Sequence, residues 1–490
     1  MLMPIDLGNL GSPDSVSLAD IPYATCDALN RAFRDDRLSP IEVATVLLER
    51  IERLDPYVNA FVFVDRAATL ASAAQSEERW RRGTPLSALD GIPVTIKDLI
   101  AVAGWPLVRG SLALLGSAPP AEDAPAVARL REAGAVLLGK TATPEAGCKI
   151  VTRSPVHGVT LNPYDLTRTP GGSSGGAAAA LALGMGPLAL GSDGAGSIRI
   201  PAAWSGVFGL KPSFGRVPIY PPGVFMPHSV VGPMTRDVES ARLMLEVISR
   251  PEPRDPYALM VPFDAQAALQ SAAGLRIGVT SDFGVASPPI DADILAAVSS
   301  AATHLQRAGA SVTEIQPKWP CDPYEPFIVL WEAVYAGFLH NTYPPEAIAK
   351  MDPELQAIAQ RGMTIDMVRY HKALIQRVAL AAHSKAIFMD FDLLIGPVMP
   401  CGPPAIARDA PEGCTAGDWR WCPFTYLWNM TGQPAASVPW AYAADGLPIG
   451  VQLVAGVGRE ADILRAAKAL QWASQFAPKP SALLARAALK

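Results

Sequence analysis

Apolar residues recur along this chain in two alternating patterns, helical periodicity and short continuous runs. A capping box at 39–42, with proline at the first helical position, opens a helix that carries Val43, Leu47, Ile51 and Leu54 on one face. Further helices are predicted at about 122–132, at about 237–248 and from about residue 460. The first of these helices is amphipathic and is expected to pack its apolar face on another element.

Short apolar, β-branched runs lie between these helices and predict strands. They occupy residues 93–97, 135–138, 188–190, 275–280, 311–315, 393–395, 435–439 and 449–454. Strands separated by helices predict an α/β fold, in which a mixed and mostly buried sheet is covered by helices on both faces.

The Ala/Leu/Gly run at 177–191 is the stretch most similar to a membrane span. It carries Gly184, Gly186 and Pro187 and falls short of about 18 consecutive apolar residues. We therefore predict a buried helix that breaks and continues as a strand, and no membrane span.

The 490 residues contain no linker-like tract and no internal repeat, so a single domain over 1–490 is predicted. One segment, about 318–428, differs from the rest in its density of large aromatic residues. These are Trp319, Trp331, Tyr335, Tyr343, Trp419, Trp421, Tyr426 and Trp428. Most of these aromatics are expected to lie in the core, because large aromatic side chains are usually buried for packing. The segment is also predicted to be the variable region that determines the substrate.

Composition narrows the function classes. Half of the residues are hydrophobic, the formal net charge is -5 and the basic residues are scattered, which argues against a disordered chain and against nucleic-acid binding. Six cysteines without C-x-x-C spacing predict reduced thiols in the cytoplasm, and the first residues show no signal-peptide pattern. A small-molecule substrate is expected, with no metal and no cofactor; the oligomeric state is not predicted.

Two glycine-rich loops carry the candidate chemistry. The second, Gly191–Ser197, follows an apolar strand, and its glycines allow successive N–H groups to converge on a developing oxyanion with Ser197 as nucleophile. A tight turn into a helix would give the same pattern.

The first loop, Gly171–Gly176, has three interpretations. It lacks the Gly-Lys-Ser/Thr of a phosphate-binding loop, and it leads into an apolar segment rather than across a domain boundary, as a linker would. Residues 171–175 also match the G-x-S-x-G elbow, which would make Ser173 the nucleophile of an α/β-hydrolase. The elbow requires a preceding strand, and 162–170 has a loop-like composition.

A serine nucleophile needs a base. The six histidines, at 157, 228, 304, 340, 371 and 383, lie outside glycine-rich and strand-end contexts. Lys97 ends the strand at 93–97, and burial would lower the pKa of its amine toward neutrality so that it accepts a proton. A lysine at a strand end, taken alone, is usually solvated and inert.

Together these motifs resemble the amidase signature family. The resemblance rests on G-I-P-V-T-I-K-D at 91–98, on G-G-S-S-G-G through G-L-K-P within 171–212, and on N-M-T-G-Q-P and D-G-L-P-I-G-V-Q-L-V within 429–454. It extends from about residue 18 to about 475. It implies the amidase signature fold and a hydrolase without a catalytic histidine.

The resemblance also implies residue roles. Ser197 is similar to the family nucleophile, Ser173 to the bridging serine with a cis peptide bond, and Lys97 to the base of this Ser–cisSer–Lys triad. The backbone N–H groups of 194–197, that is Gly194, Ala195, Gly196 and Ser197, would form the oxyanion hole of an acyl-enzyme mechanism. The resemblance further implies that Ser174, Asp193 and Arg199 support the site.

One position departs from the family pattern. Ala195 stands where the family usually has a glycine, and its methyl group restricts the backbone unless φ is negative. The Ala195 substitution therefore leaves open which amides of the loop point inward.

The same family resemblance bears on the substrate class. The A-type subunit of the tRNA-dependent amidotransferase shares the signature, but the apolar, proline-rich segment 217–227 lacks the polar pattern expected of that subunit. A stand-alone amidase for a bulky acyl or aryl amide is favoured, and the family also contains enzymes that cleave anilides, esters and carbamates (urethanes). Gly147 and Cys148 are candidate pocket residues. The two alternatives left open are an amidotransferase A-type subunit that works in a complex and an α/β-hydrolase esterase with Ser173 as nucleophile.

Overall fold

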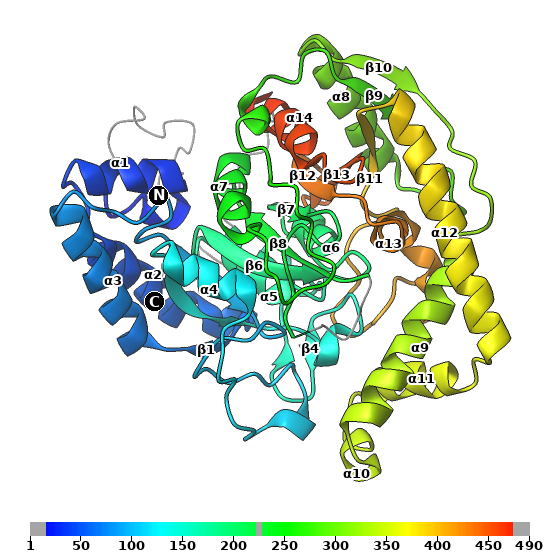
Figure 1. Ribbon diagram of the computed structural model, residues 1–490, viewed down its shortest axis with the longest axis horizontal. Helices are drawn as coiled ribbons and strands as arrows, with labels where there is room; N and C mark the ends of the chain where they lie inside the picture. Colours follow the sequence, from blue (N-terminus) through cyan, green and yellow to red (C-terminus); the bar gives the residue numbers. More distant parts are fainter. Residues whose placement is uncertain (1–15, 222–227, 474–490) are drawn as a thin grey trace.

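A computed structural model describes residues 16–221 and 228–473 (Figure 1). Within these residues one sheet has eleven strands in the order β1-β3-β2-β6-β8-β7-β12-β13-β11-β9-β10. Its strands are β1 (Phe61–Val64), β2 (Pro93–Lys97), β3 (Val136–Thr141), β6 (Leu188–Asp193), β7 (Phe208–Lys211), β8 (Val230–Thr235), β9 (Arg276–Val279), β10 (Ser311–Glu314), β11 (Leu393–Pro397), β12 (Ala435–Tyr442) and β13 (Pro448–Ala455). A separate short pair comprises β4 (Arg153–Ser154) and β5 (Gly158–Val159).

The sheet is mixed. β2 pairs in parallel with β3 and β6, and β9 in parallel with β10 and β11, whereas the central strands from β6 through β13 pair antiparallel. The helices are α1 (Cys26–Arg34), α2 (Pro40–Val58), α3 (Arg66–Arg81), α4 (Pro125–Glu132), α5 (Gly175–Ala182), α6 (Arg199–Trp204), α7 (Val238–Ile248), α8 (Ala292–Arg307), α9 (Tyr324–Thr342), α10 (Pro345–Ile348), α11 (Pro353–Met363), α12 (Met367–Asp390), α13 (Pro423–Met430) and α14 (Glu460–Ala473).

Helices cover both faces of the sheet. Side chains alternate between the two faces of a strand, so neighbouring residues report on opposite layers. Leu188 and Leu190 of β6 lie in the apolar cluster that includes residues of α2, α7 and α14, whereas Ala189 packs with Ala178 of α5 and Ala202 of α6. The predicted α/β fold with a buried sheet is confirmed.

Several predicted elements have the expected bounds. The Ser39 hydroxyl accepts a hydrogen bond from the Glu42 N–H and the Glu42 carboxylate accepts one from the Ser39 N–H, which completes the capping box of α2. The run at 177–191 forms most of α5 and then β6, as predicted. In the described residues no helix is long and apolar enough to cross a membrane.

The aromatic-rich segment contains helices α9–α12 and strand β11. α9 packs on both α11 and α12, and Figure 1 shows α9–α12 at the end of the molecule opposite α1–α3. Most of the predicted core aromatics are buried there: Trp331, Tyr335, Trp419, Trp421, Tyr426 and Trp428. Trp319 and Tyr343 are partly exposed.

Candidate active site

The parallel pair of β2 and β6 positions the candidate base. Ile96 of β2 lies opposite Leu190 of β6, and both strands run in the same direction, so their carboxyl ends meet at one edge of the sheet. Lys97 is the last residue of β2, and β6 ends at Asp193. The glycine-rich loop that contains Ser197 therefore begins beside Lys97.

Three serine hydroxyls surround the amine of Lys97. Its Nζ lies 2.7 Å from the Oγ of Ser173, 2.9 Å from that of Ser174 and 3.0 Å from that of Ser192. The side chain is completely buried. Burial lowers the pKa of Lys97 well below its ordinary value, although the charge of Asp193 acts in the opposite direction. A neutral amine in this position has a lone pair that can accept a hydroxyl proton.

Ser173 does not sit on a nucleophile elbow. Residues 162–170 contain no strand, whereas an elbow places its serine directly after one. The hydrogen bond to the Ser173 hydroxyl in the described part of the chain comes from Lys97 rather than from a histidine. The Gly172–Ser173 peptide bond is cis, as the family resemblance implies. The geometry thus favours Ser173 as a partner of Lys97 over Ser173 as an independent nucleophile.

Ser197 opens onto the same cavity as Ser173. It lies between β6 and α6, 5 % exposed, and lines a cavity of about 760 Å³ together with Ser173, Ser192 and Gly194. The N–H of Ser174 donates to the Ser197 carbonyl over 3.1 Å, which ties the two glycine-rich loops together. The structure therefore brings all three residues of the predicted triad to one site.

The oxyanion loop, residues 194–197, is held in place through the peptide unit between Ala195 and Gly196. The Thr425 hydroxyl donates to the carbonyl of Ala195 over 2.7 Å, and the N–H of Gly196 donates to the Asp193 carboxylate over 2.7 Å. Ala195 is absent from the described residues with positive φ, so its methyl group is accommodated; Gly196 has a φ of +126°. The expectation that the Gly196 amide faces the oxyanion is corrected, because that N–H is already bound to Asp193. No described residue accepts a hydrogen bond from the N–H groups of Gly194, Ala195 and Ser197.

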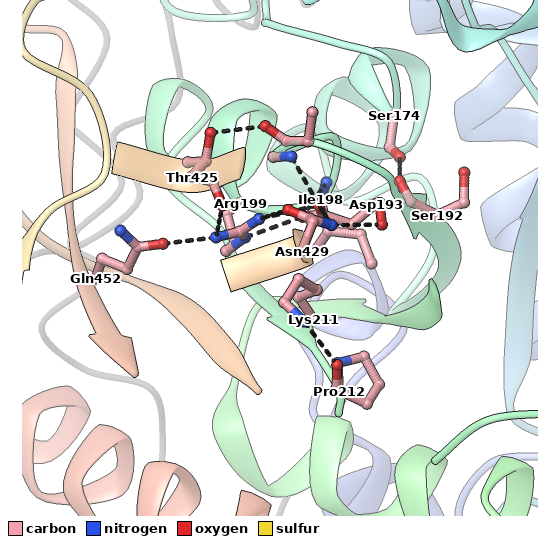
Figure 2. Close-up of polar contacts among 12 residues, drawn as sticks. Ser174, Ser192, Asp193, Ile198, Arg199, Lys211, Pro212, Thr425, Asn429 and Gln452 are labelled. Atoms are coloured by element: carbon pink, nitrogen blue, oxygen red, sulfur yellow. Dashed lines mark hydrogen bonds and ion pairs between the residues drawn. The ribbon is translucent and has the colours of Figure 1, made fainter. Parts of the chain in front are cut away.

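A buried ion pair between Asp193 and Arg199 holds this loop (Figure 2). Arg199 donates from Nε and Nη2 to the two oxygens of Asp193, each over 3.0 Å, and neither side chain is exposed. Arg199 also donates to the Thr425 carbonyl and to the side chains of Asn429 and Gln452. These contacts satisfy the guanidinium, which a buried charge requires. Asp193 and Arg199 therefore hold the loop in place, and neither is among the residues that line the cavity.

The charges around Asp193 determine its protonation. Burial alone would raise the pKa of this carboxyl, but Arg199, Lys211 and Asn429 outweigh burial and hold it well below its usual range. Lys211 is also completely buried; burial and the charge of Arg199 lower its pKa to about 7. Asp193 is consequently a carboxylate at any pH at which the protein is expected to work.

Of the two pocket candidates, only Gly147 lines the cavity. A Cβ added at Gly147 would lie 3.2 Å from the Ser173 Oγ, and the φ of this residue is +72°. Cys148 points away from the cavity into an apolar cluster, and burial raises the pKa of its thiol well above its ordinary value. The prediction that Cys148 is a pocket residue is therefore wrong: the tight turn at 145–147 directs adjacent residues in different directions.

The cavity is mainly apolar. Its larger apolar lining residues are Leu99, Ile100, Leu107, Ile219, Val231, Trp331 and Phe338. Residues 218–221 of the predicted apolar loop line it, while 222–227 lie outside the described residues. From the aromatic-rich segment only α9 contributes, through Trp331, Phe338 and Thr342. A second cavity, of about 870 Å³ beside Trp204 and Cys401, contains none of the predicted site residues.

Sequence reasoning missed four residues of the site. Ser192 contacts Lys97, and Thr425, Asn429 and Gln452 hold the Asp193–Arg199 pair and its loop. Asn429 and Gln452 lie in the two C-terminal motifs, so their polar side chains within apolar runs were an available signal. Among the described residues no group of three His, Cys, Asp or Glu side chains could hold a metal ion.

Comparisons with known proteins show the family to which the chain belongs. The family model described as Amidase matches residues 42–464. An acylamidase from Rhodococcus erythropolis is 33 % identical over 477 residues, which cover 94 % of this chain and 98 % of that protein. The A-type subunit of the glutamyl-tRNA(Gln) amidotransferase from Symbiobacterium thermophilum is 34 % identical over 477 residues, covering 90 % and 95 %. The crystal structure of a bacterial aryl acylamidase of the amidase signature family matches with a TM-score of 0.86 and 30 % identity over 93 % of this chain and 97 % of that one.

Proposed function

Because the chain belongs to the amidase family and is an amide C–N hydrolase, we propose that it acts alone on bulky acyl or aryl amides through an acyl-enzyme on Ser197. Lys97 is the base in this proposal, and Ser173 carries the proton between Lys97 and the reacting groups. The observation that carries the proposal is the buried amine of Lys97, 2.7 Å from the Ser173 hydroxyl.

The first half of the reaction forms an ester. Neutral Lys97 takes the hydroxyl proton of Ser173 as Ser173 takes that of Ser197, and the Ser197 oxygen forms a bond to the substrate carbonyl carbon. The N–H groups of Gly194, Ala195 and Ser197 stabilise the oxyanion; one such donor contributes about 3–4 kcal/mol to transition-state binding. When the C–N bond breaks, Ser173 gives a proton to the leaving nitrogen and recovers one from Lys97.

Water completes the reaction. A water molecule attacks the acyl-enzyme carbonyl while its proton passes through Ser173 to Lys97, and the proton then returns to the Ser197 oxygen as the acid leaves. Amide and water are consumed, and acid and amine are produced in equal number. The same carbonyl chemistry extends to esters and to aryl carbamates (urethanes), whose carbonyl carbon accepts the same attack.

The cavity supports a bulky, mainly apolar substrate. Its volume of about 760 Å³ falls in the range typical of small-molecule sites, and its walls are mostly aliphatic and aromatic. The acylamidase and aryl acylamidase relatives are consistent with an acyl or aryl amide, for which 4-nitroacetanilide is a convenient probe.

Labelling with a fluorophosphonate and mapping the adduct by mass spectrometry tests the assignment of the nucleophile. We expect the label on Ser197, and Ser197→Ala, Ser173→Ala and Lys97→Ala each to lose most turnover of 4-nitroacetanilide while remaining folded. A label on Ser173 would instead support the α/β-hydrolase alternative. Full turnover by Lys97→Ala at neutral pH would contradict the role of the lysine.

The second candidate function is that of an amidotransferase A-type subunit. The 34 % identity to the Symbiobacterium thermophilum protein favours it. Such a subunit would release ammonia from glutamine within a complex. A glutaminase assay on the isolated chain, next to the anilide assay and gel filtration, separates the two: anilide turnover without glutamine turnover supports the stand-alone amidase.

A further inference from the structure

One cationic side chain lines the cavity in which the triad lies. Among the described lining residues only Arg109 and Glu122 are charged. Glu122 forms an ion pair with Arg254 over 3.2 Å, and its side chain is mostly exposed. No described residue accepts a hydrogen bond or forms an ion pair with the Arg109 guanidinium. An arginine in a mainly apolar cavity, without a partner of its own, is suited to bind an anion.

The carboxylates around Arg109 have other partners. Asp98 forms an ion pair with Lys140 over 3.3 Å. One carboxylate oxygen of Glu145 accepts a hydrogen bond from the N–H of Asp352. The positive charge of Arg109 is therefore left for a ligand.

The backbone holds Arg109 in a conformation that arginine rarely adopts. Its φ is +53° and that of the following Gly110 is +67°. Only glycine and, less readily, asparagine or aspartate enter this left-handed region without a steric penalty. Such outliers cluster at functional sites, where the surrounding structure maintains them. A role of the Arg109 side chain in ligand binding accounts for the presence of arginine at a position that favours glycine.

The backbone of Arg109 adjoins the part of the cavity wall that lies beside Ser173. The carbonyl of Arg109 accepts a hydrogen bond from the N–H of Ala146 over 2.9 Å, and the next residue, Gly147, forms the wall beside the Ser173 hydroxyl. In the proposed reaction Ser173 protonates the leaving nitrogen. The amine half of the substrate therefore lies against the wall to which Arg109 is attached.

We propose that Arg109 is a specificity-determining residue that binds a carboxylate on the amine half of the substrate, so that the preferred substrates are N-acylated amino acids or aminobenzoates. This inference rests on the proposed function, because the side of the scissile bond is assigned from the role of Ser173. The planar guanidinium binds a carboxylate through two parallel hydrogen bonds. Binding expels water from an apolar cavity, which strengthens this interaction.

Two matched substrate pairs test the inference on the full chain. The first pair, 4-acetamidobenzoate and 4-acetamidobenzamide, differs only by a charge on the amine half. The second, the 4-nitroanilides of succinic and butyric acid, differs by a charge on the acyl half. We expect the native protein to favour 4-acetamidobenzoate by about 10- to 100-fold in kcat/KM, the range for a hydrogen-bonded charge.

Arg109→Gln should bring that ratio close to one. Arg109→Gly should do the same, and it relieves the left-handed strain, so it remains informative if Arg109→Gln does not fold. Arg276→Gln removes an exposed arginine from β9 and should keep the ratio. An unchanged ratio in both Arg109 variants would overturn the inference, as would an Arg109-dependent preference confined to the acyl-half pair.

A binding measurement separates this inference from the proposed function. Calorimetry with 4-aminobenzoate, the amine product, on Ser197→Ala should show binding that Arg109→Gln weakens about 10- to 100-fold. If binding depends on Arg109 but neither aryl amide is cleaved by the native protein, the proposed aryl-amide function fails and the anion site stands. If the neutral amide is cleaved and 4-aminobenzoate binding is indifferent to Arg109, only the anion site fails.

Discussion

Replacing Asp193 by asparagine tests whether the buried ion pair holds the oxyanion loop. The carboxylate of Asp193 accepts five hydrogen bonds, from the backbone of Gly196 and Ile198, from two nitrogens of Arg199 and from Asn429. An asparagine of the same shape turns one of these acceptors into a donor. The variant leaves the Arg199 charge buried without its counter-ion.

The burial of the Asp193–Arg199 pair determines how much stability is lost when the pair is broken. Asp35 and Arg37 form a pair of the same 3.0 Å length at the surface, with side chains 53 % and 32 % exposed, whereas both partners of the Asp193 pair are fully buried. At 3.0 Å the attraction is about 5.5 kcal/mol for an effective dielectric constant of about 20 and about 1.4 kcal/mol in water. Breaking one partner of a buried pair typically costs about 3–5 kcal/mol, and an exposed pair contributes about 0–1 kcal/mol.

Urea unfolding followed by tryptophan fluorescence measures the difference. Asp193→Asn should lower the free energy of unfolding by about 3–5 kcal/mol, and Asp35→Asn by less than about 1 kcal/mol. Equal losses in the two variants would refute the argument that burial decides the contribution. The depressed pKa of Asp193 adds a pH test with a defined sign: its stabilisation is complete above the ordinary carboxyl pKa and is lost as the pH falls below about 4 toward the folded-state value.

Three further predictions concern activity. The kcat/KM of the native protein should fall at acid pH as Lys97 becomes protonated. Arg199→Gln leaves the charge of Asp193 uncompensated, so it should raise the Lys97 pKa and move this acid-side fall in kcat/KM to higher pH. A move to lower pH would contradict the prediction. Gly147→Ala should lose at least about 10-fold in kcat/KM, since its Cβ would lie 2.9 Å from Leu99 and against the Ser173 hydroxyl. Gly104 has a similar φ of +76° and open space around it, so the control variant Gly104→Ala should lose only about 1 kcal/mol of stability, from its backbone conformation alone. Thr425→Val should lower kcat with little change in KM, because it frees the carbonyl of the oxyanion loop; a pure KM effect would argue for a role in substrate binding.

Much of the sheet was predictable because its strands are short, apolar and β-branched. β1, β7 and β8 were not predicted, and in β7 and β8 the patterns are interrupted by Gly209 and Gly232. A Cβ at Gly232 would lie 2.3 Å from the Leu210 carbonyl, and one at Gly209 would collide with Ala202 of α6. These glycines permit close approach of neighbouring backbones, a requirement that a one-dimensional pattern does not contain. Helix α9 was not predicted, because its many apolar and aromatic residues obscure the helical periodicity.

The triad candidates could be named from sequence, whereas the support of the oxyanion loop could not. Lys97, Ser173 and Ser197 lie in motifs whose glycines and serines are themselves informative. Thr425 binds the Ala195 carbonyl from 230 positions along the chain, and no local spacing predicts such a contact. Gly147 and Cys148 show that neighbours in sequence need not share a role. Both were predicted to line the pocket, but the turn directs them to different environments.

The Asp193–Arg199 pair reconciles two opposing requirements of a lysine-based site. Lys97 must be neutral to accept a proton, and the charge of Asp193 favours the protonated amine. The same carboxylate is needed to hold the Gly196 amide and, through it, the peptide that carries Ala195. Because Arg199 binds both carboxylate oxygens, it balances most of this charge without releasing the backbone. A lone carboxylate would hold the loop but raise the Lys97 pKa, and an uncharged side chain would accept fewer of the five hydrogen bonds. The desolvation of two charges is therefore the cost of an oxyanion loop that stays ordered next to a neutral lysine.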